Sequence, residues 1–192
     1  MQASIGDRVK LPLTFDSSAL QRDLAILNDT IWVEHFVRQN YQGKWTVLPL
    51  RGPAGAEHPV RMIYSDPGCK DYSDTAYLEP CHYFKQVLQS FRCELHAVRL
   101  MKLTPGSVIR KHRDYDLSLE DGVVRLHIPI VTSPEVEFML NDKRVDMHAG
   151  ECWYLRLSDP HSVLNGGTID RVHLVIDTPV NEWLTQLLTG NK

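Results

Sequence analysis

The sequence is poor in cysteine, and its few cysteines are widely spaced. Cys69, Cys81, Cys93 and Cys152 form no CxxC pair among the 192 residues. Zinc sites usually draw on close cysteine pairs, and small secreted domains on a dense disulfide framework. Neither pattern is present, so we interpret the four cysteines as reduced thiols and expect a cytoplasmic protein without a zinc site.

Long apolar runs and a strong charge of either sign are also missing. No apolar run approaches the roughly 18 residues that a membrane-spanning helix needs. The formal net charge of −3 gives no electrostatic case for nucleic acid or an anionic membrane as a partner. The first residues show no basic segment followed by an apolar one, so no secretory signal is expected. What remains is the composition of a globular protein, 43% hydrophobic and 23% charged.

Apolar spacing predicts helices near both ends of the chain and many short strands in its second half. Leu20, Leu24 and Leu27 recur at helical spacing after Asp16, a favourable helix cap. Further helices are expected at 83–91 and after Thr178-Pro179, and a surface loop at 65–81. Strands are expected at 44–51, 60–64, 94–103, 107–115, 123–131, 135–140, 143–147, 151–157, 161–164 and 170–177, with Asn141-Asp142 as a hairpin turn.

Many short strands separated by turns are typical of a β-barrel or β-sandwich. The chain has no internal repeat, low-complexity tract or linker-like stretch. We therefore expect one mainly β domain over 1–192. Residues 1–92 would elaborate a jelly-roll core at 93–178, and 179–192 would form a C-terminal helix.

Three residues in two turn-and-strand settings are candidate metal ligands. His112 and Asp114 follow the turn at Pro105-Gly106 and stand two residues apart, so on a strand both would point to one face. His161 lies in a second turn-and-strand segment and must come from a different strand end. Two imidazoles and one carboxylate form the facial triad of non-heme Fe(II) oxygenases. These three residues are accordingly the predicted catalytic metal site.

Arg171, ten residues after His161, is the candidate partner for an anionic co-substrate. Two neutral imidazoles and a carboxylate leave a ferrous ion with one net positive charge, which suits an anionic chelator. A planar guanidinium can bind the far carboxylate of such a molecule with two hydrogen bonds.

The alternation of residues on two strands gives an independent indication of a pocket. Arg125 and His127 share one face of the strand at 123–131, opposite an apolar row. Arg171 and His173 do the same on the strand at 170–177. With the apolar rows packed against a second layer, these four side chains would line the mouth of the barrel, where they fit a dicarboxylate.

Several short motifs resemble one known family. Between about residues 97 and 178 the chain is similar to the aspartyl/asparaginyl β-hydroxylase family of 2-oxoglutarate oxygenases, which includes bacterial proline hydroxylases. The resemblance is carried by Gly106-x5-His112-x-Asp114, Pro160-His161-x3-Asn165, His112-Arg-Asp-Tyr115, Arg125-Leu-His127 and Arg171-Val-His-Leu-Val-Ile-Asp177. The first two look like the half-motifs of the cupin double-stranded β-helix.

The resemblance implies a cofactor set and a reaction. It implies Fe(II), 2-oxoglutarate and O2, and hydroxylation of an unactivated C–H bond with release of succinate and CO2. Arg125 and His127 would contact 2-oxoglutarate or the substrate carboxylate, and His173 is a further candidate for the cofactor pocket. Because Asp114 is kept as the carboxylate ligand, the resemblance favours the bacterial branch, which acts on small substrates.

The substrate and some alternatives stay open. Arg61 is a candidate for the substrate carboxylate, and Tyr115 or Asp116 for a substrate amino group. The substrate would be a free amino acid, a derivative on a carrier, or a peptidyl Asp or Asn. A metal-binding cupin without turnover, a cupin isomerase and a dioxygenase that needs no 2-oxoglutarate are the competing functions. The oligomeric state is open, with a homodimer as the commonest arrangement.

Overall fold

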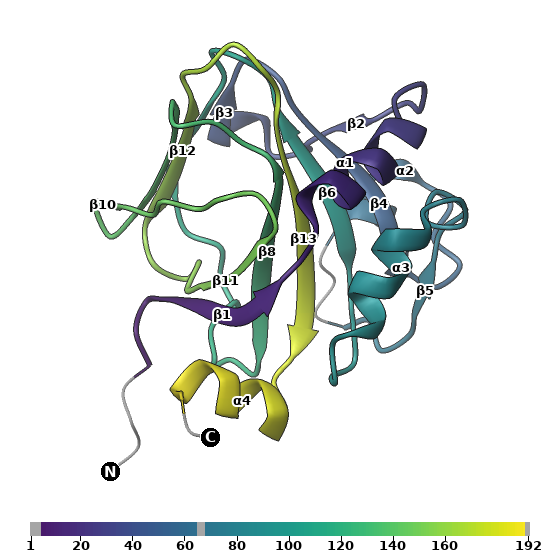
Figure 1. The fold of residues 1–192 in the computed structure, drawn as a ribbon, viewed down its shortest axis with the longest axis vertical. Coiled ribbons are helices and arrows are strands. Elements are labelled where there is room, and N and C mark those ends of the chain that lie inside the picture. The colour runs from purple at the N-terminus through teal and green to yellow at the C-terminus, as the bar shows by residue number, and fades with distance from the viewer. Residues whose placement is uncertain (1–4, 65–67, 191–192) are drawn as a thin grey trace.

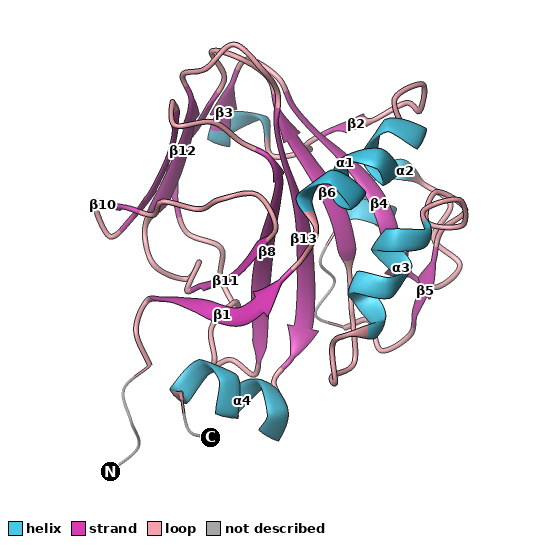
Figure 2. Cartoon of the chain, viewed as in Figure 1, coloured by secondary structure: helices cyan, strands magenta, loops and turns pink. Residues whose placement is uncertain are grey.

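The computed structural model describes residues 5–64 and 68–190, and these form two antiparallel β-sheets with helices packed outside them (Figure 1, Figure 2). The larger sheet has the order β1 (Arg8–Thr14), β11 (Glu151–Leu155), β8 (Val123–Val131), β13 (Arg171–Pro179), β6 (Val98–Leu103), β4 (Trp45–Pro53) and β2 (Val33–Glu34), with β5 (Tyr72–Asp74) paired to β4. The smaller sheet has the order β10 (Lys143–Arg144), β9 (Val136–Leu140), β12 (His161–Asn165), β7 (Val108–His112) and β3 (Tyr41–Gln42). The expected mainly β architecture is confirmed.

The helices cover the outer face of the larger sheet and one end of it. In Figure 1, α1 (Ser17–Ile26) and α3 (His82–Gln89) lie together beside β4 and β6, and α4 (Glu182–Thr189) lies below β1. Leu20, Phe84 and Leu184 bring these helices into one buried cluster with the sheet. The remaining helical elements are α2 (Pro59–Ile63) and the 3-10 turn η1 (Arg38–Asn40).

Strict alternation on the central strands separates an apolar layer from a polar one. On β8, Val124, Leu126 and Ile128 belong to the cluster beneath the helices. Arg125 and His127, between them, are buried on the opposite side and line a cavity. Residues on successive strand positions point to opposite faces, so one strand can serve both layers. The face assignment expected from the sequence is confirmed for β8.

Local signals explain the helix starts. Asp16 caps α1 as expected, accepting hydrogen bonds from the backbone N–H groups of Ser18 and Ala19 at 2.8 and 3.1 Å. The C-terminal helix begins later than expected, because Thr178 and Pro179 still belong to β13. Asn181 caps it instead.

Two element predictions in the N-terminal half are wrong, and the strand β1 was missed. The segment expected as a strand at 60–64 is α2, which starts with Pro59 in its first turn and is capped by His58. The pattern of a short apolar run does not distinguish a strand from a helix. Here Pro59 favours the helix, because proline fits well in the first helical turn. The strand β1 was not expected, although Val9, Leu11 and Leu13 alternate along it. The expected loop at 65–81 contains β5, and its residues 65–67 lie outside the described part.

The predicted hairpin turn at Asn141-Asp142 is confirmed between β9 and β10. Both residues have positive φ, 50° and 58°. That backbone is the one that two-residue hairpins with right-handed strand twist require, and Asn and Asp tolerate it best among residues with side chains.

Candidate metal centre and its cavity

Adjacent strands of the smaller sheet bring the three predicted ligands together. His112 ends β7 and His161 begins β12, and the two are register partners. Asp114 lies two residues beyond the end of β7, not on the strand as expected, and its backbone N–H donates to the Leu157 carbonyl at 2.9 Å. The candidate ligand atoms of His112, Asp114 and His161 all lie within 4.8 Å of one another.

Hydrogen bonds on the far side of both imidazoles orient them for a metal. Nδ1 of His112 lies 2.7 Å from the Arg110 carbonyl oxygen, and Nδ1 of His161 lies 3.0 Å from that of Asp159. A carbonyl only accepts, so each Nδ1 carries a proton, and in its neutral form each ring offers the lone pair of Nε2 to a metal. Such a bond behind the ring is the usual arrangement of metal-binding histidines. The residues present therefore fit a divalent metal.

The carboxylate of Asp114 is held by one oxygen and leaves the other facing the imidazoles. Its Oδ2 accepts a hydrogen bond from Arg125 Nη1 at 2.8 Å, and its Oδ1 lies 3.4 Å from His112 Nε2. Burial alone would raise the pKa of Asp114, but the hydrogen bond with His112 and the charge of Arg125 hold it well below its usual range. The side chain is thus in the ionised form that a metal needs.

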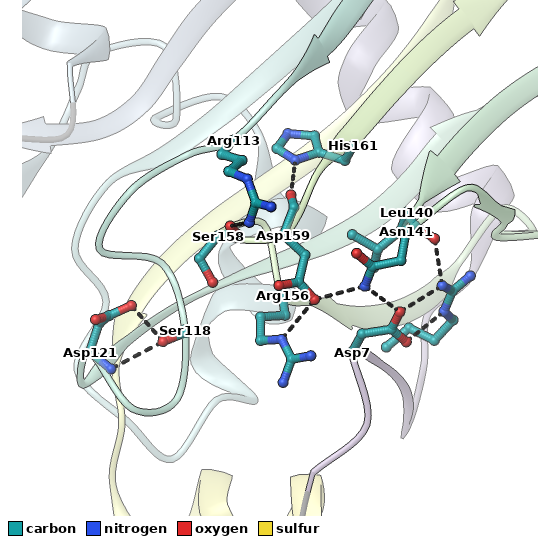
Figure 3. A network of polar contacts seen from close by, with 11 residues as sticks. Asp7, Arg113, Ser118, Asp121, Leu140, Asn141, Arg156, Ser158, Asp159 and His161 are labelled. Atoms are coloured by element: carbon teal, nitrogen blue, oxygen red, sulfur yellow. Dashed lines mark hydrogen bonds and ion pairs between the residues drawn. The ribbon is translucent and has the colours of Figure 1, made fainter.

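A polar network anchors the loop that carries His161 (Figure 3). The Asp159 carboxylate accepts hydrogen bonds from Asn141 Nδ2 at 2.7 Å and from Arg156 Nε at 2.9 Å. Asn141 also donates to Asp7 at 2.9 Å, just before β1. The hydrogen bond from Arg8 lowers the pKa of Asp7 to about 2. The backbone carbonyl that orients His161 is therefore fixed from the hairpin and from the N-terminal strand.

A direct bond joins the two loops that carry the ligands. Arg113 Nη1 donates to the Ser158 carbonyl oxygen at 2.9 Å (Figure 3). Together with the Asp114–Leu157 backbone bond, this holds the loop after β7 against the loop before β12. The position of Asp114 relative to His161 does not depend on one side chain alone.

Arg171 is a buried cation with no acidic partner in residues 5–64 and 68–190. Its side chain is 2% exposed, and its Nη2 donates to Nδ1 of His173 at 2.9 Å. Within the described chain it forms no salt bridge, and its Nε is buried without a hydrogen-bond partner. Burial lowers the pKa of Arg171 to about 9. An uncompensated buried charge is costly, so the site favours a carboxylate from outside the chain.

Two neutral imidazoles lie beside Arg171. His127 on β8 and His173 on β13 approach with their Nδ1 atoms 3.4 Å apart, and burial lowers the pKa of both well below the usual value. The Nε2 atoms of both are buried and have no hydrogen-bond partner in the described part of the chain. His127 lines the cavity with Arg171. His173 does not line it, and its Nδ1 contacts both His127 and Arg171.

Arg125 connects the metal group to a second buried carboxylate. Its Nε and Nη2 donate to the two oxygens of Asp177 at 2.6 and 3.0 Å, and Arg99 pairs with the same carboxylate. Arg99 and Asp177 both line the cavity and were not predicted. Asp177 could have been found from the alternation of side chains along β13, because it shares the face of Arg171 and His173.

A single cavity of about 710 Å³ contains these groups and has an aromatic side. His35, Phe36 and Trp45, from the N-terminal half, line it together with the metal group. Tyr115 and Asp116, two of the candidate substrate contacts, also line it, and Tyr115 is 81% exposed.

The third candidate substrate contact lies elsewhere. Arg61 is exposed on α2 and borders a separate hollow of about 340 Å³. The expected strand that would have carried it toward the barrel is a helix instead. Arg61 is therefore not brought together with the other predicted residues.

Comparison with known proteins gives a family-level match over most of the chain. Residues 18–179 match the model of the aspartyl/asparaginyl beta-hydroxylase family. An L-proline cis-3-hydroxylase from a Streptomyces species is 27% identical over 183 residues, covering 92% of this chain and 60% of the relative. An L-proline cis-4-hydroxylase from Rhizobium meliloti is 27% identical over 169 residues, covering 85% and 57%. The chain thus spans somewhat over half the length of these curated relatives.

The fold is also found among solved structures. A Burkholderia pseudomallei protein described as an oxidoreductase of the 2OG-Fe(II) oxygenase family aligns with a TM-score of 0.56 at 15% identity, covering 90% of this chain and 85% of that one. This likeness confirms the double-stranded β-helix core expected from the sequence. In the part of the chain that the structure describes, the helices are all too short or too polar to cross a membrane.

Proposed function

The chain belongs to the aspartyl/asparaginyl beta-hydroxylase family, and from this premise we propose that it is an Fe(II)- and 2-oxoglutarate-dependent hydroxylase. Its substrate is a small amino acid or amino-acid derivative, in which an unactivated C–H bond is hydroxylated while succinate and CO2 are released. One observation carries the proposal. The donor atoms of His112, Asp114 and His161 meet in the same cavity that holds Arg171, a buried cation with no acidic partner among the described residues.

The proposed roles of the metal-binding residues follow from their hydrogen bonds. His112 and His161 present Nε2, and Asp114 presents Oδ1, to one point in the cavity. When bound there, Fe(II) with 2-oxoglutarate and O2 supplies the oxidising power for the reaction. The protein contributes a fixed set of donors and a place for each reactant.

The proposed co-substrate pocket lies along β8 and β13. Arg171 binds the far carboxylate of 2-oxoglutarate, and His127, neutral and buried, lies next to it with an unused ring nitrogen. His173 fixes the direction of the Arg171 guanidinium through the 2.9 Å hydrogen bond. Arg125 holds the second oxygen of Asp114 and so keeps the metal ligand from turning away.

The names of the relatives support an amino-acid substrate over a peptidyl one, since both are hydroxylases of L-proline. We further propose a cytoplasmic location, which fits four cysteines that are all free thiols in the structure. A homodimer is proposed as the commonest oligomeric state. Cell fractionation and light scattering check these two points.

The experiment that tests the reaction is turnover with Fe(II), 2-oxoglutarate and O2 across a panel of free amino acids and short peptides. Succinate should form slowly without substrate and faster with the correct one, and the product should gain the mass of one oxygen. A protein that binds metal but forms no succinate under any of these conditions would be a binding module without turnover. That result would reject the proposed function.

A further inference from the structure

The cavity is larger than the proposed co-substrate and a proline-sized amino acid require. Together these two molecules have about 18 non-hydrogen atoms, and at the roughly 30 Å³ that each water molecule takes up in the liquid they would fill about 540 Å³. The cavity has about 710 Å³. Its size is in the range of about 300–1,000 Å³ that is typical of pockets for drug-sized ligands. Space is left for a substrate with a longer side chain.

A continuous row of rings borders this space, and we name it the aromatic wall: Trp45, His35, Phe36 and Tyr64. The His35 ring stacks on Trp45 at 3.6 Å between centroids and on Phe36 at 4.8 Å. Tyr64 meets Phe36 edge-on at 5.6 Å. All four rings line the cavity. They come from β4 and from the loops after β2 and α2, outside the strands that carry the metal group.

The aromatic wall extends from the interior to the mouth of the cavity. Trp45 is 7% exposed, whereas Phe36 is 39% and Tyr64 45% exposed. Exposed rings that continue a buried apolar surface are typical of a ligand site, because water contact is unfavourable for them until a ligand covers them. A substrate no larger than proline would leave the outer rings uncovered.

The aromatic wall is uncharged and is continued by apolar side chains. Burial, and then the nearby charges of Arg125 and Arg99, lower the pKa of His35 to about 3, so this ring is neutral. Both guanidinium groups are already ion-paired to Asp177, so they leave little free charge near the rings. Ile63 and Met101, which also line the cavity, add apolar surface.

We propose that the aromatic wall binds the side chain of an amino-acid substrate that is apolar and larger than proline, such as a branched aliphatic or an aromatic one. This inference rests on the proposed function and names the substrate class of the same site. The amino-acid head would lie toward the metal group and the side chain toward Phe36 and Tyr64. These rings would then set which amino acids the enzyme accepts.

Calorimetric titration of the protein loaded with Ni(II) and 2-oxoglutarate, which cannot turn over, tests the inference. The probes are L-leucine, L-isoleucine, L-methionine and L-phenylalanine, compared with L-proline, L-lysine and L-aspartate. We expect the tightest binding from one of the first four. Phe36→Ala should raise its Kd about tenfold, the loss expected for part of a buried ring, and leave the Kd of 2-oxoglutarate within about twofold. Ile31→Ala is the control, since Ile31 is 86% exposed and does not line the cavity.

The outcomes separate this inference from the function on which it rests. A protein that binds neither Ni(II) nor 2-oxoglutarate would overturn both. A protein that binds both would overturn the inference alone if L-proline, L-lysine or L-aspartate bound at least as tightly as every larger apolar amino acid, or if none of the probes bound. The same holds if Phe36→Ala left the Kd of the preferred amino acid unchanged.

Discussion

Arg125 donates from Nη1 to Oδ2 of Asp114 at 2.8 Å, and so fixes the orientation of the carboxylate in the candidate metal group. The rest of the guanidinium is bonded to Asp177, which Arg99 also contacts. The buried Arg125–Asp177 pair thus holds the candidate metal ligand Asp114 in place. The planar guanidinium can do this because its N–H donors reach both carboxylates at once.

Replacing Arg125 by lysine should weaken metal binding without removing the charge. The ammonium group cannot bond to Asp177 and Asp114 in the same geometry. Loss of a residue that orients a ligand typically costs about 10–100-fold in metal affinity. Competition between the variant and a chelator for Co(II) measures this. Arg51→Lys is the control, because Arg51 bonds to Asp74 outside the cavity. An unchanged affinity in Arg125→Lys would show that Asp114 needs no such support.

Replacing Arg171 by methionine should have opposite effects on stability and on binding. The unliganded protein should become more stable, by on the order of 1–4 kcal/mol, because a buried charge that has no acidic partner in the described part of the chain gives way to an apolar side chain. Stabilisation by added 2-oxoglutarate should disappear. Urea unfolding with and without 2-oxoglutarate measures both. A variant that is stabilised by 2-oxoglutarate as strongly as the original protein would contradict the assigned role of Arg171.

Asn141 offers a test of the network behind His161. Asn141→Gly removes the bonds to Asp159 and Asp7 while it preserves the positive φ. We expect a loss of about 1 kcal/mol of unfolding free energy and a several-fold weaker affinity for Co(II). Asp142→Gly is the matched control, since Asp142 also has positive φ but its side chain bonds to the exposed Lys111, outside the network behind His161. Equal effects of the two substitutions would show that the losses arise from the turn backbone and not from the hydrogen bonds of the Asn141 side chain.

The stability of the protein in acid should depend on Asp7. The hydrogen bond from Arg8 lowers the pKa of Asp7 from 3.8 to about 2. A carboxyl with a lowered pKa contributes stability that is complete above 3.8 and is lost as the pH falls toward 2. Asp7→Asn should therefore be less stable than the original protein above this interval, and the difference should shrink within it. Urea unfolding at several pH values gives the curve, and a difference that does not change with pH would contradict the assignment.

Much of the site could be predicted because its residues follow the alternation of strands. His112 and His161 lie on neighbouring strands, and Arg171 lies on a central strand among apolar neighbours. The face shared by Arg125 and His127 was also evident. Asp114 departs from the prediction because the chain leaves the sheet after His112, a change that turn geometry controls and alternation does not reveal.

The rest of the cavity depends on contacts between distant segments. Arg99 contacts Asp177 across 78 positions of the chain, and, although alternation places Asp177 on the face of Arg171, no local pattern marks Arg99 as part of a site. The rings of His35 and Phe36 lie in a loop, where no periodicity fixes which way a side chain points. The helix at Pro59–Ile63 is a similar case, since a five-residue apolar run interrupted only by Arg61 is compatible with a strand or a helix.

The central claim is that one metal, held by His112, Asp114 and His161, shares its cavity with 2-oxoglutarate held by Arg171. Anaerobic titration of Fe(II) and 2-oxoglutarate into the protein, followed by visible absorption, tests it most directly. We expect a weak charge-transfer band at one iron per chain, lost in His112→Ala and in His161→Ala. The absence of the band in the original protein, or its persistence in both variants, would contradict the account.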